Sequence, residues 1–466
     1  MARTPSSMNL SEAAQAPTGS HEESHLNRYA FRIAIAAAIG GFLFGYDISI
    51  ISGALIFLKS EFALDQHQEG FAVSSAALGC IIGPLVAAAL SDKIGRRGTL
   101  AVSALLLFLA SLGTAIPKDM ITFNAFRILG GIGVGLASIV TPMYIAEMAP
   151  ARLRGRLVSV NQLAIVIGLF SAIVVSYALS FRGDWRWMFG SECLPALAWL
   201  GLLFALPESP RWLMEKGREA EALALLIKSE GPVKSHVALA EIKDSMREEV
   251  GNWSELFQPG TRTALLVAVM LAIFQQATGV SILLVYAPTI FKSAGFDLPS
   301  DAIAQAIPLG VWNIICTALA FWLVDRWGRR PLLLAGTAAM AVGLVVMGLC
   351  FHYQVTGYAV VVMMFLCVGA YVSSLAPLAW LIMSEIFPTR VRGRAMSIAG
   401  ICLWIAFFVG SQVFPLLSHS FEREFGSPAG VFWLFSGVCL LALGFCWRLV
   451  PETKGRTLEE IAGAWK

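Results

Sequence analysis

The feature that most constrains this chain is a series of apolar runs, each long enough to cross a lipid bilayer. A transmembrane helix needs about 20 consecutive apolar residues, and a window of about 19 residues finds twelve such runs. They lie near residues 30–58, 71–90, 99–117, 121–147, 157–180, 187–206, 263–291, 302–324, 331–351, 357–386, 395–418 and 430–449. The sequence therefore predicts an all-α membrane protein with twelve transmembrane helices.

Composition supports this prediction and excludes several classes of function. Hydrophobic residues make up 57% of the 466 residues and charged residues only 14%, so most of the chain should lie within membrane lipid. The net charge of +3 is too small to indicate binding of nucleic acid. The eight cysteines have no metal-binding spacing, and the sequence has no nucleophile elbow or Walker loop. We therefore expect no metal, no cofactor and no enzymatic activity.

Basic residues between the runs predict the orientation in the membrane. The loops after the second, fourth, eighth and tenth runs contain clusters of Arg and Lys, whereas the alternate loops contain few. Because cytoplasmic loops are enriched in these residues, both termini should lie in the cytoplasm. We expect residues 1–27 to be a disordered cytoplasmic tail, 207–260 to be a cytoplasmic linker with short helices, and 451–466 to be a cytoplasmic C-terminal segment.

An internal repeat divides the runs six and six. Three segments recur in the same order, at offsets of 233, 238 and 244 residues. The pairs are 90–97 with 323–330, 147–156 with 385–394, and 207–209 with 451–453. Such a repeat predicts two six-helix halves, 28–206 and 261–450, related by an axis along the membrane normal. This is a transporter architecture.

The repeated segments place acidic residues and arginines at matched positions. Charge-assisted hydrogen bonds among them could tie helix ends together on the cytoplasmic side. A latch of this kind stabilises one conformer and opens in the other, as rocking of two halves requires. The simpler alternative is that the arginines only set topology. The predicted latch residues are Asp92, Arg96, Arg97, Glu147, Arg154, Glu208, Asp325, Arg329, Arg330, Glu385, Arg392 and Glu452.

Asp47 needs a specific explanation, because it lies inside the first apolar run. A charged side chain at membrane depth costs about 2.5 to 3.5 kcal/mol on insertion scales, so it persists mainly where it faces a protein interior or a water-filled pathway. Counting about 1.5 Å per residue from the run ends places Asp47, Arg127 and Glu192 in the same outer half of the membrane. Proton binding at Asp47 would then free Arg127 from its partner. The alternative is a static ion pair that fixes helix packing.

Several motifs resemble those of the sugar porter family of the major facilitator superfamily, over residues 28–460. They are GGFLFGYD at 40–47, DKIGRR at 92–97, RILGGIGVGLAS at 127–138, PESPRWL at 207–213, QQATGV at 275–280, DRWGRR at 325–330 and PETKGRTLEEI at 451–461. The run SECLPA at 191–196 is similar to bacterial proton-coupled xylose and hexose symporters. The resemblance implies the major facilitator fold, a sugar and a proton as transported partners, and an Asp kept at position 47 for coupling. A short tail and compact loops favour a bacterial inner membrane, and we expect a monomer.

The resemblance also implies a central substrate site. Amide side chains there would bond to sugar hydroxyls, and an indole would cover the C–H face of the ring. The residues concerned are Phe44, Gln162, Gln275, Gln276, Ser281, Tyr286, Asn313 and Trp380. For any one amide, a hydrogen bond between helices is the alternative.

The chain departs from the family pattern at four positions. Ser281 stands where the family usually has Asn, Leu403 replaces the amide that commonly precedes Trp404, Val285 replaces the first of two paired tyrosines, and Ala88 replaces a Gly. Because fewer amides give a weaker polar grip, the site should discriminate less among hydroxyl patterns. A pentose, a hexose, a deoxy sugar and a polyol all stay candidates.

These observations together predict a proton-coupled monosaccharide symporter that works by alternating access. One alternative is a facilitative sugar uniporter, in which Asp47 would not titrate during transport. Others are a sugar sensor that does not transport, and a transporter of a polyol or a cyclic hydroxy acid.

Overall fold

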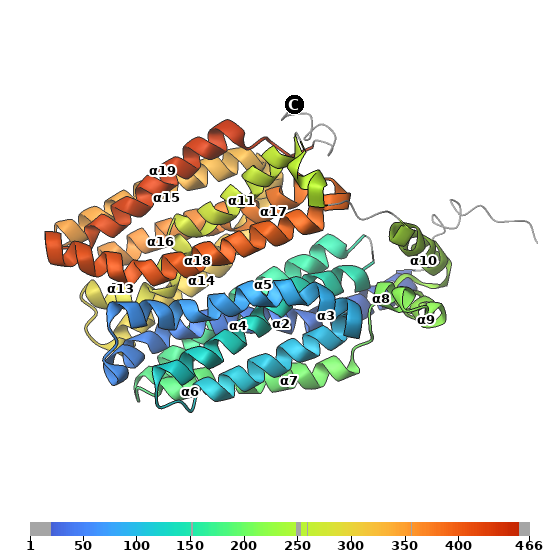
Figure 1. The fold of residues 1–466 in the computed structure, drawn as a ribbon, viewed down its shortest axis with the longest axis horizontal. Coiled ribbons are helices and arrows are strands. Elements are labelled where there is room, and N and C mark those ends of the chain that lie inside the picture. Colours follow the sequence, from blue (N-terminus) through green and yellow to red (C-terminus); the bar gives the residue numbers. More distant parts are fainter. Residues whose placement is uncertain (1–19, 151, 248–252, 259, 356, 456–466) are drawn as a thin grey trace, which may run out of the picture.

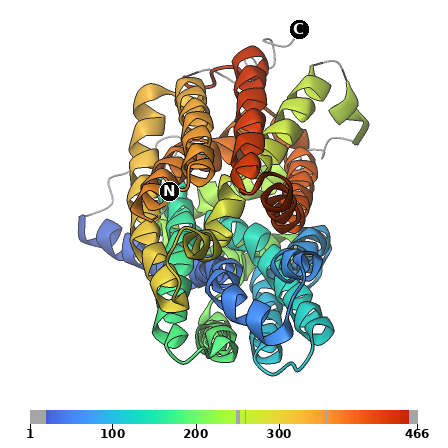
Figure 2. The same ribbon diagram turned by 90° about the vertical axis from the view of Figure 1, so that its left-hand side faces the viewer.

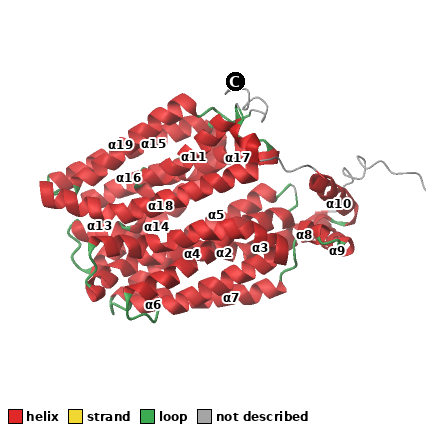
Figure 3. Ribbon diagram, in the orientation of Figure 1, coloured by secondary structure: helices red, strands yellow, loops and turns green. Residues whose placement is uncertain are grey.

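The structure is a computed structural model that describes residues 20–150, 152–247, 253–258, 260–355 and 357–455. Within these ranges all regular secondary structure is helical (Figure 3). Most of the predicted N-terminal tail, residues 1–19, and the end of the C-terminal segment, residues 456–466, lie outside the described residues. The first helix begins at Ser20, ten residues before the first predicted run.

The N-terminal half has four long helices, followed by a sixth span that is broken into two shorter helices. Its helices are α2 (Ser20–Phe62), α3 (Gln66–Thr114), α4 (Met120–Met148), α5 (Arg154–Ser180), α6 (Trp185–Gly190) and α7 (Cys193–Ala205). Helix α3 contains the second and third predicted runs, which meet at Gly95 in a left-handed backbone conformation (φ 86°). A Cβ atom at Gly95 would lie 2.3 Å from Glu208 Oε2, so both the turn and its contact require glycine.

Short helices connect the two halves at one end of the molecule. They are α8 (Pro210–Glu215), α9 (Glu219–Glu230), α10 (Pro232–Arg247) and the 3₁₀ turn η1 (Trp253–Phe257). Ser209 caps α8 by accepting a hydrogen bond from the Trp212 backbone N–H, and proline occupies the first helical position. Leu213, Ala222 and Leu226 form a small apolar core of their own. These linker helices lie at the right-hand end of Figure 1, and we call the opposite end of the bundle the outer end.

The C-terminal half repeats the arrangement of the first. Its helices are α11 (Thr261–Ala277), α12 (Val280–Val285), α13 (Ala287–Ser293), α14 (Pro299–Trp327), α15 (Arg329–His352), α16 (Tyr358–Ser373), α17 (Leu375–Glu385), α18 (Thr389–Phe425) and α19 (Ala429–Leu449). Eleven stretches of the described chain are long and apolar enough to cross a membrane. Because one of them, α3, turns at Gly95 and holds two runs, the predicted twelve transmembrane helices are confirmed.

Three of the predicted runs are broken inside the membrane. The seventh is interrupted at Gly279 (φ 84°), where a Cβ atom would lie 2.4 Å from the Phe435 ring. The sixth breaks at Ser191 and Glu192, and the tenth breaks at Ser374. Broken helices in transporters place polar side chains and free backbone groups at a central site.

The two halves lie beside each other as separate helix bundles (Figures 1 and 2). Within the first half, α3 and α4 approach at small residues: a Cβ atom at Gly131 would lie 1.9 Å from the Ala76 carbonyl oxygen. Close backbone contact of this kind gives dispersion energy that lipid cannot replace. Between the halves, α3 packs on α18 and α5 packs on α14.

A charged cluster closes the linker end of the N-terminal half. The Glu208 carboxylate accepts hydrogen bonds from the backbone N–H groups of Arg96 and Arg97, at 2.9 and 3.2 Å. The Arg96 guanidinium lies 3.0 Å from Glu147 and 3.3 Å from Glu215. These bonds join the α3 turn, the end of α4 and the start of the linker.

The C-terminal half carries the same cluster at the repeated positions. Glu452 accepts from the backbone N–H groups of Arg329 and Arg330, each at 3.0 Å. Arg329 Nη2 lies 3.1 Å from Glu385 Oε1, and Thr453 Oγ1 donates to Glu385 Oε2 at 2.5 Å. Each cluster therefore stabilises one half.

The remaining predicted latch residues lie around these clusters. Arg392 donates to the Phe387 carbonyl oxygen at 3.2 Å, and Arg154 is exposed with no ion-pair partner among the described residues. Asp92 is exposed, and its carbonyl oxygen accepts from Trp212 Nε1. The Asp325 side chain lies outside the described part of the chain. A latch between Glu147, Arg154, Glu385 and Arg392 that closes the linker end in another conformer stays a prediction.

Glu452 generates a prediction about stability. Partial burial raises the pKa of the Glu452 carboxyl, but backbone N–H donors from Lys454, Arg329, Arg330 and Thr453 outweigh it and hold the pKa below its ordinary value. Glu452→Gln should lower the free energy of unfolding by about 1–3 kcal/mol, because these donors lose a charged acceptor. Thermal unfolding of the purified protein at pH 7 measures this difference.

The pH dependence has a fixed sign. A carboxyl whose pKa is lower in the folded state contributes stability at neutral pH and loses it as the pH falls through that pKa. The difference between wild type and Glu452→Gln should therefore shrink below about pH 4. Glu422→Gln, at an exposed position near the outer end of α18, is the matched control. Equal unfolding temperatures for Glu452→Gln and wild type at pH 7 would contradict this account.

Candidate functional site

An ion pair between Asp47 and Arg127 lies inside the N-terminal half. Arg127 Nη1, on α4, donates to Asp47 Oδ1, on α2, at 2.7 Å. The two side chains are only 2% and 5% exposed. A carboxylate this deeply buried keeps its charge only beside a cation, so α2 and α4 hold the two groups as a unit.

The pair is incompletely satisfied. Asp47 Oδ2 and Arg127 Nε have no hydrogen-bond partner among the described residues, and neither has Glu192 Oε1. Glu192 lies at the break between α6 and α7, is 1% exposed, and is close enough to interact electrostatically with both members of the pair. One guanidinium therefore lies near two carboxylates, and their competition for it stays a prediction.

Three neighbours that the sequence did not single out position this cluster. The Tyr46 hydroxyl lies 2.6 Å from Ser191 Oγ, which itself donates to the Met188 carbonyl oxygen. This bond ties the break in the sixth span to α2, next to Asp47. The Arg127 guanidinium also lies over the Phe189 ring at 5.5 Å, a favourable cation–π contact. Tyr46 and Ser191 directly precede Asp47 and Glu192 and lie within the motifs GGFLFGYD and SECLPA, and these positions were the signals available for them.

Gln275 and Gln276, on α11, leave one amide oxygen and one amino group without a partner among the described residues. Gln275 Nε2 donates to the Ala376 carbonyl oxygen at 2.6 Å, and Gln275 Oε1 is buried without a partner. Gln276 Oε1 accepts from Ser281 Oγ at 2.5 Å, which leaves its Nε2 hydrogens available. Ser281, predicted as a substrate ligand, thus binds Gln276. The two glutamines together can accept from one hydroxyl and donate to another.

The other predicted substrate residues are spread over both halves. Asn313 lines a pocket with Ser49 and Phe170, whereas Tyr286 is fully buried and donates to the Ser411 carbonyl oxygen at 2.9 Å. Gln162 is exposed and Trp380 is 38% exposed. The Phe44 ring lies 6.0 Å from the Trp404 ring. The structure brings Gln275, Gln276 and Ser281 together, but within the described part of the chain no hydrogen bond joins them to Gln162 or Trp380.

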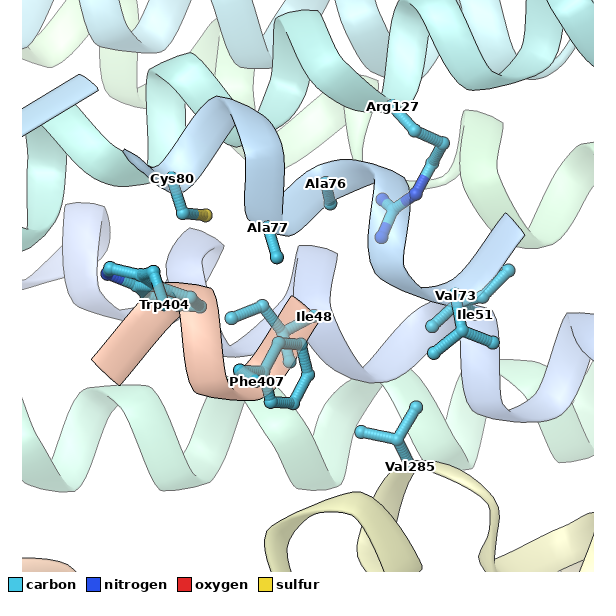
Figure 4. A pocket seen from close by; sticks show the side chains of 10 residues that line it. All are labelled: Ile48, Ile51, Val73, Ala76, Ala77, Cys80, Arg127, Val285, Trp404 and Phe407. Carbon is cyan, nitrogen blue, oxygen red and sulfur yellow. The ribbon is translucent and has the colours of Figure 1, made fainter. Parts of the chain in front are cut away.

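A second pocket lies between the halves beside the ion pair (Figure 4). Arg127 lines it from the first half, and Trp404 and Phe407 line it from α18. The remaining walls are the small or aliphatic side chains of Ile48, Ile51, Val73, Ala76, Ala77, Cys80 and Val285. Val285 borders both pockets, and its side chain is smaller than the tyrosine that the family resemblance implies at this position. Arg127 therefore reaches the surface on which the halves meet.

Comparison with known proteins identifies the family of this chain. The family model described as "Sugar (and other) transporter" matches residues 33–465. The D-xylose-proton symporter of Escherichia coli (strain K12) is 38% identical, with 94% of this chain and 96% of the relative covered. The arabinose-proton symporter of Bacillus subtilis (strain 168) is 35% identical, with 95% and 96% covered.

Solved structures give the same assignment. The inward-open xylose transporter XylE from E. coli matches with a TM-score of 0.83 at 37% identity, over 94% of this chain and 100% of that one. XylE bound to 6-bromo-6-deoxy-D-glucose matches over the same shares with a TM-score of 0.76. This chain belongs to the sugar porter family of the major facilitator superfamily.

Proposed function

We propose that this protein is a proton-coupled monosaccharide symporter that works by alternating access. The observation that carries the proposal is the buried, incompletely satisfied Asp47–Arg127 pair, placed in one of two six-helix halves. The relatives named as D-xylose-proton and arabinose-proton symporters support it. We further infer a bacterial inner membrane with both termini in the cytoplasm, because the Arg clusters lie at the linker end. A monomer suffices, because one chain supplies both halves.

Coupling follows from exchange of partners at Arg127. A proton that reaches Asp47 from the outer side neutralises its carboxylate and removes the attraction that holds the guanidinium. Glu192, equally buried and with a free carboxylate oxygen, then becomes the available acceptor. When the site opens to the cytoplasm, Arg127 returns to Asp47 as the proton leaves. The proton is bound on one side and released on the other, with no covalent change.

The pocket beside the pair connects this exchange to the movement of the halves. Arg127 lines a wall that also includes Trp404 and Phe407 of the opposite half. A shift of the guanidinium from Asp47 toward Glu192 changes both the charge and the shape of that wall. Each protonation state therefore favours a different fit between the halves, which is the differential interaction that a population shift requires.

The first prediction concerns accumulation. One proton moving down about 100 mV supplies about 2.3 kcal/mol, and one pH unit adds about 1.4 kcal/mol. Asp47→Asn should abolish uphill uptake while leaving exchange of sugar down its gradient, because Asn cannot carry the proton. Uptake of labelled D-xylose into proteoliposomes, with and without an imposed proton gradient, measures both activities.

Its matched control is Asp301→Asn, at an exposed position in the first turn of α14. This control should accumulate sugar like wild type. Full uphill uptake by Asp47→Asn would refute an obligatory role for Asp47. Gradient-independent uptake by the wild-type protein would instead favour the facilitative uniporter.

The second prediction concerns the sugar site. Gln275 Oε1 is buried without a protein partner, so a substrate hydroxyl is its natural donor. Gln275→Ala should weaken binding of every transported sugar by about 1–3 kcal/mol, since the hydroxyl loses its acceptor. Titration of the purified protein with a panel of pentoses, hexoses, deoxy sugars and polyols measures the dissociation constants.

Ser281→Ala is the companion variant. Removing the hydroxyl frees Gln276 Oε1 and lets the amide turn, so the ranking among sugars should change more than the affinity for the best one. Gln305→Ala, on α14, is the control, because the Gln305 side chain forms no hydrogen bond among the described residues. Unchanged dissociation constants in Gln275→Ala would place the sugar elsewhere.

A further inference from the structure

The halves are joined near the outer end by a polar contact that the coupling site does not use. Gln412, on α18, engages both ends of its amide: Ser74 Oγ donates to Oε1 at 3.1 Å, and Nε2 donates to the His67 carbonyl oxygen at 2.9 Å. Ser74 and His67 both belong to α3, in the other half. One side chain therefore supplies two hydrogen bonds across the interface.

The position of this contact follows from the helix directions. Helix α3 begins at Gln66, immediately after the short loop that ends α2 at the outer end. Helix α18 starts at Thr389, at the linker end, and Gln412 follows 23 residues later, which is roughly 34 Å along the helix. The contact therefore lies in the outer part of the interface, next to the pocket beside the ion pair, which Val73 and Arg127 both line.

The backbones meet directly at the same place. A Cβ atom at Gly70 would lie 2.6 Å from the Gln412 carbonyl oxygen, so α18 rests on α3 without an intervening side chain. On the other side, the Tyr286 hydroxyl donates to the carbonyl oxygen of Ser411 at 2.9 Å. The α18 backbone next to Gln412 is thus bonded within its own half.

A buried carboxylate lies on the same turn of α3. Glu69 Oε2 is 2.6 Å from Lys59 Nζ, and the Glu69 side chain is 4% exposed whereas the Lys59 side chain is 50% exposed. A carboxylate withdrawn from water interacts more strongly with its partner than a hydrated one does. Tyr286 of the other half lies close enough to interact electrostatically with Glu69. Movement of that half away from α3 would therefore hydrate Glu69 and weaken this pair, so the ion pair adds to the difference between the closed and open outer ends.

We propose that Gln412, Ser74 and the His67 carbonyl form an outer clasp that holds the outer side shut and sets how often it opens to bind a sugar. The inference rests on alternating access from the proposed function, but not on the identity of the substrate or on proton coupling. Every member of the clasp belongs to a rigid helix, and both hydrogen bonds must break together when α18 moves away from α3. Gln412 is accordingly a positioning residue, since it acts on the site through the movement of the halves.

The test measures the outer opening without any substrate. Spin labels at Lys118→Cys and Glu424→Cys, exposed positions near the outer end of the two halves, report the distance between the halves in the full-length protein in lipid nanodiscs. A sample without these two cysteines accounts for labelling of native thiols. Gln412→Leu, which keeps the size of the side chain but loses both bonds, should raise the ratio of long-distance to short-distance populations about tenfold, equivalent to about 1.4 kcal/mol.

Two further variants make the result decisive. Ser74→Ala removes one of the two bonds and should give a smaller shift in the same direction, and it decides the question alone if Gln412→Leu does not fold. Gln305→Leu makes the same chemical change on α14, where no hydrogen bond is lost among the described residues, and should leave the distances unchanged. Distances unchanged in both Gln412→Leu and Ser74→Ala would overturn the clasp. Because no sugar or gradient is present, failure of the proposed transport function would appear in the uptake assays instead.

Discussion

The buried ion pair between Asp47 and Arg127 is the interaction on which the rest of the structure depends. Arg127 Nη1 donates to Asp47 Oδ1 at 2.7 Å, but Asp47 Oδ2 and Arg127 Nε have no hydrogen-bond partner among the described residues. A fully satisfied buried network rigidifies a protein, whereas a pair with unused hydrogen-bonding atoms can accept a second partner. Glu192 lies close enough to both groups to be the second carboxylate in the exchange that we propose. The pair is therefore better suited to switching than to fixing helix packing.

In the transport cycle that we propose, the surrounding fold converts a local exchange into a movement of whole halves. At the linker end, Glu208 and Glu452 each hold the turn between two helices through backbone N–H donors, with the same geometry in both repeats. Close contacts such as Gly131 against Ala76 pack the N-terminal half tightly. Two halves stiffened in this way respond to a change at their interface by rotating as bodies.

Much of this could be predicted from the sequence, because a membrane restricts what a chain can do. Lipid requires long apolar helices, so the twelve spans follow from hydropathy, and the three repeated motifs give the two halves. The depth of Asp47 and Arg127 follows from counting residues along helices. Ser281 shows the limit of sequence reasoning. It was predicted as a substrate ligand, but its hydroxyl donates to Gln276 Oε1. Nothing in the sequence says which atoms of an amide already have a protein partner.

Other features depend on contacts between distant residues. Hydrophobic periodicity does not report the breaks at Ser191, Gly279 and Ser374, because the side chains around them stay apolar. The partners of Gln412 lie more than 300 residues earlier in the chain, in a segment with no motif that points to α18. The repeated positions of Glu147 and Glu385 indicated contacts at the linker end. The structure shows that each bonds to an arginine of its own half, Glu147 to Arg96 and Glu385 to Arg329.

The central claim is that sugar and proton move together through this protein. The measurement that tests it most directly uses proteoliposomes with no imposed proton gradient. Sugar entry and external pH are recorded simultaneously after D-xylose is added outside. The account predicts that the external medium becomes alkaline as the sugar enters, with a fixed ratio of protons to sugar across sugar concentrations. Entry of sugar with no change in external pH, under conditions where a pH change of that size is detectable, would contradict it.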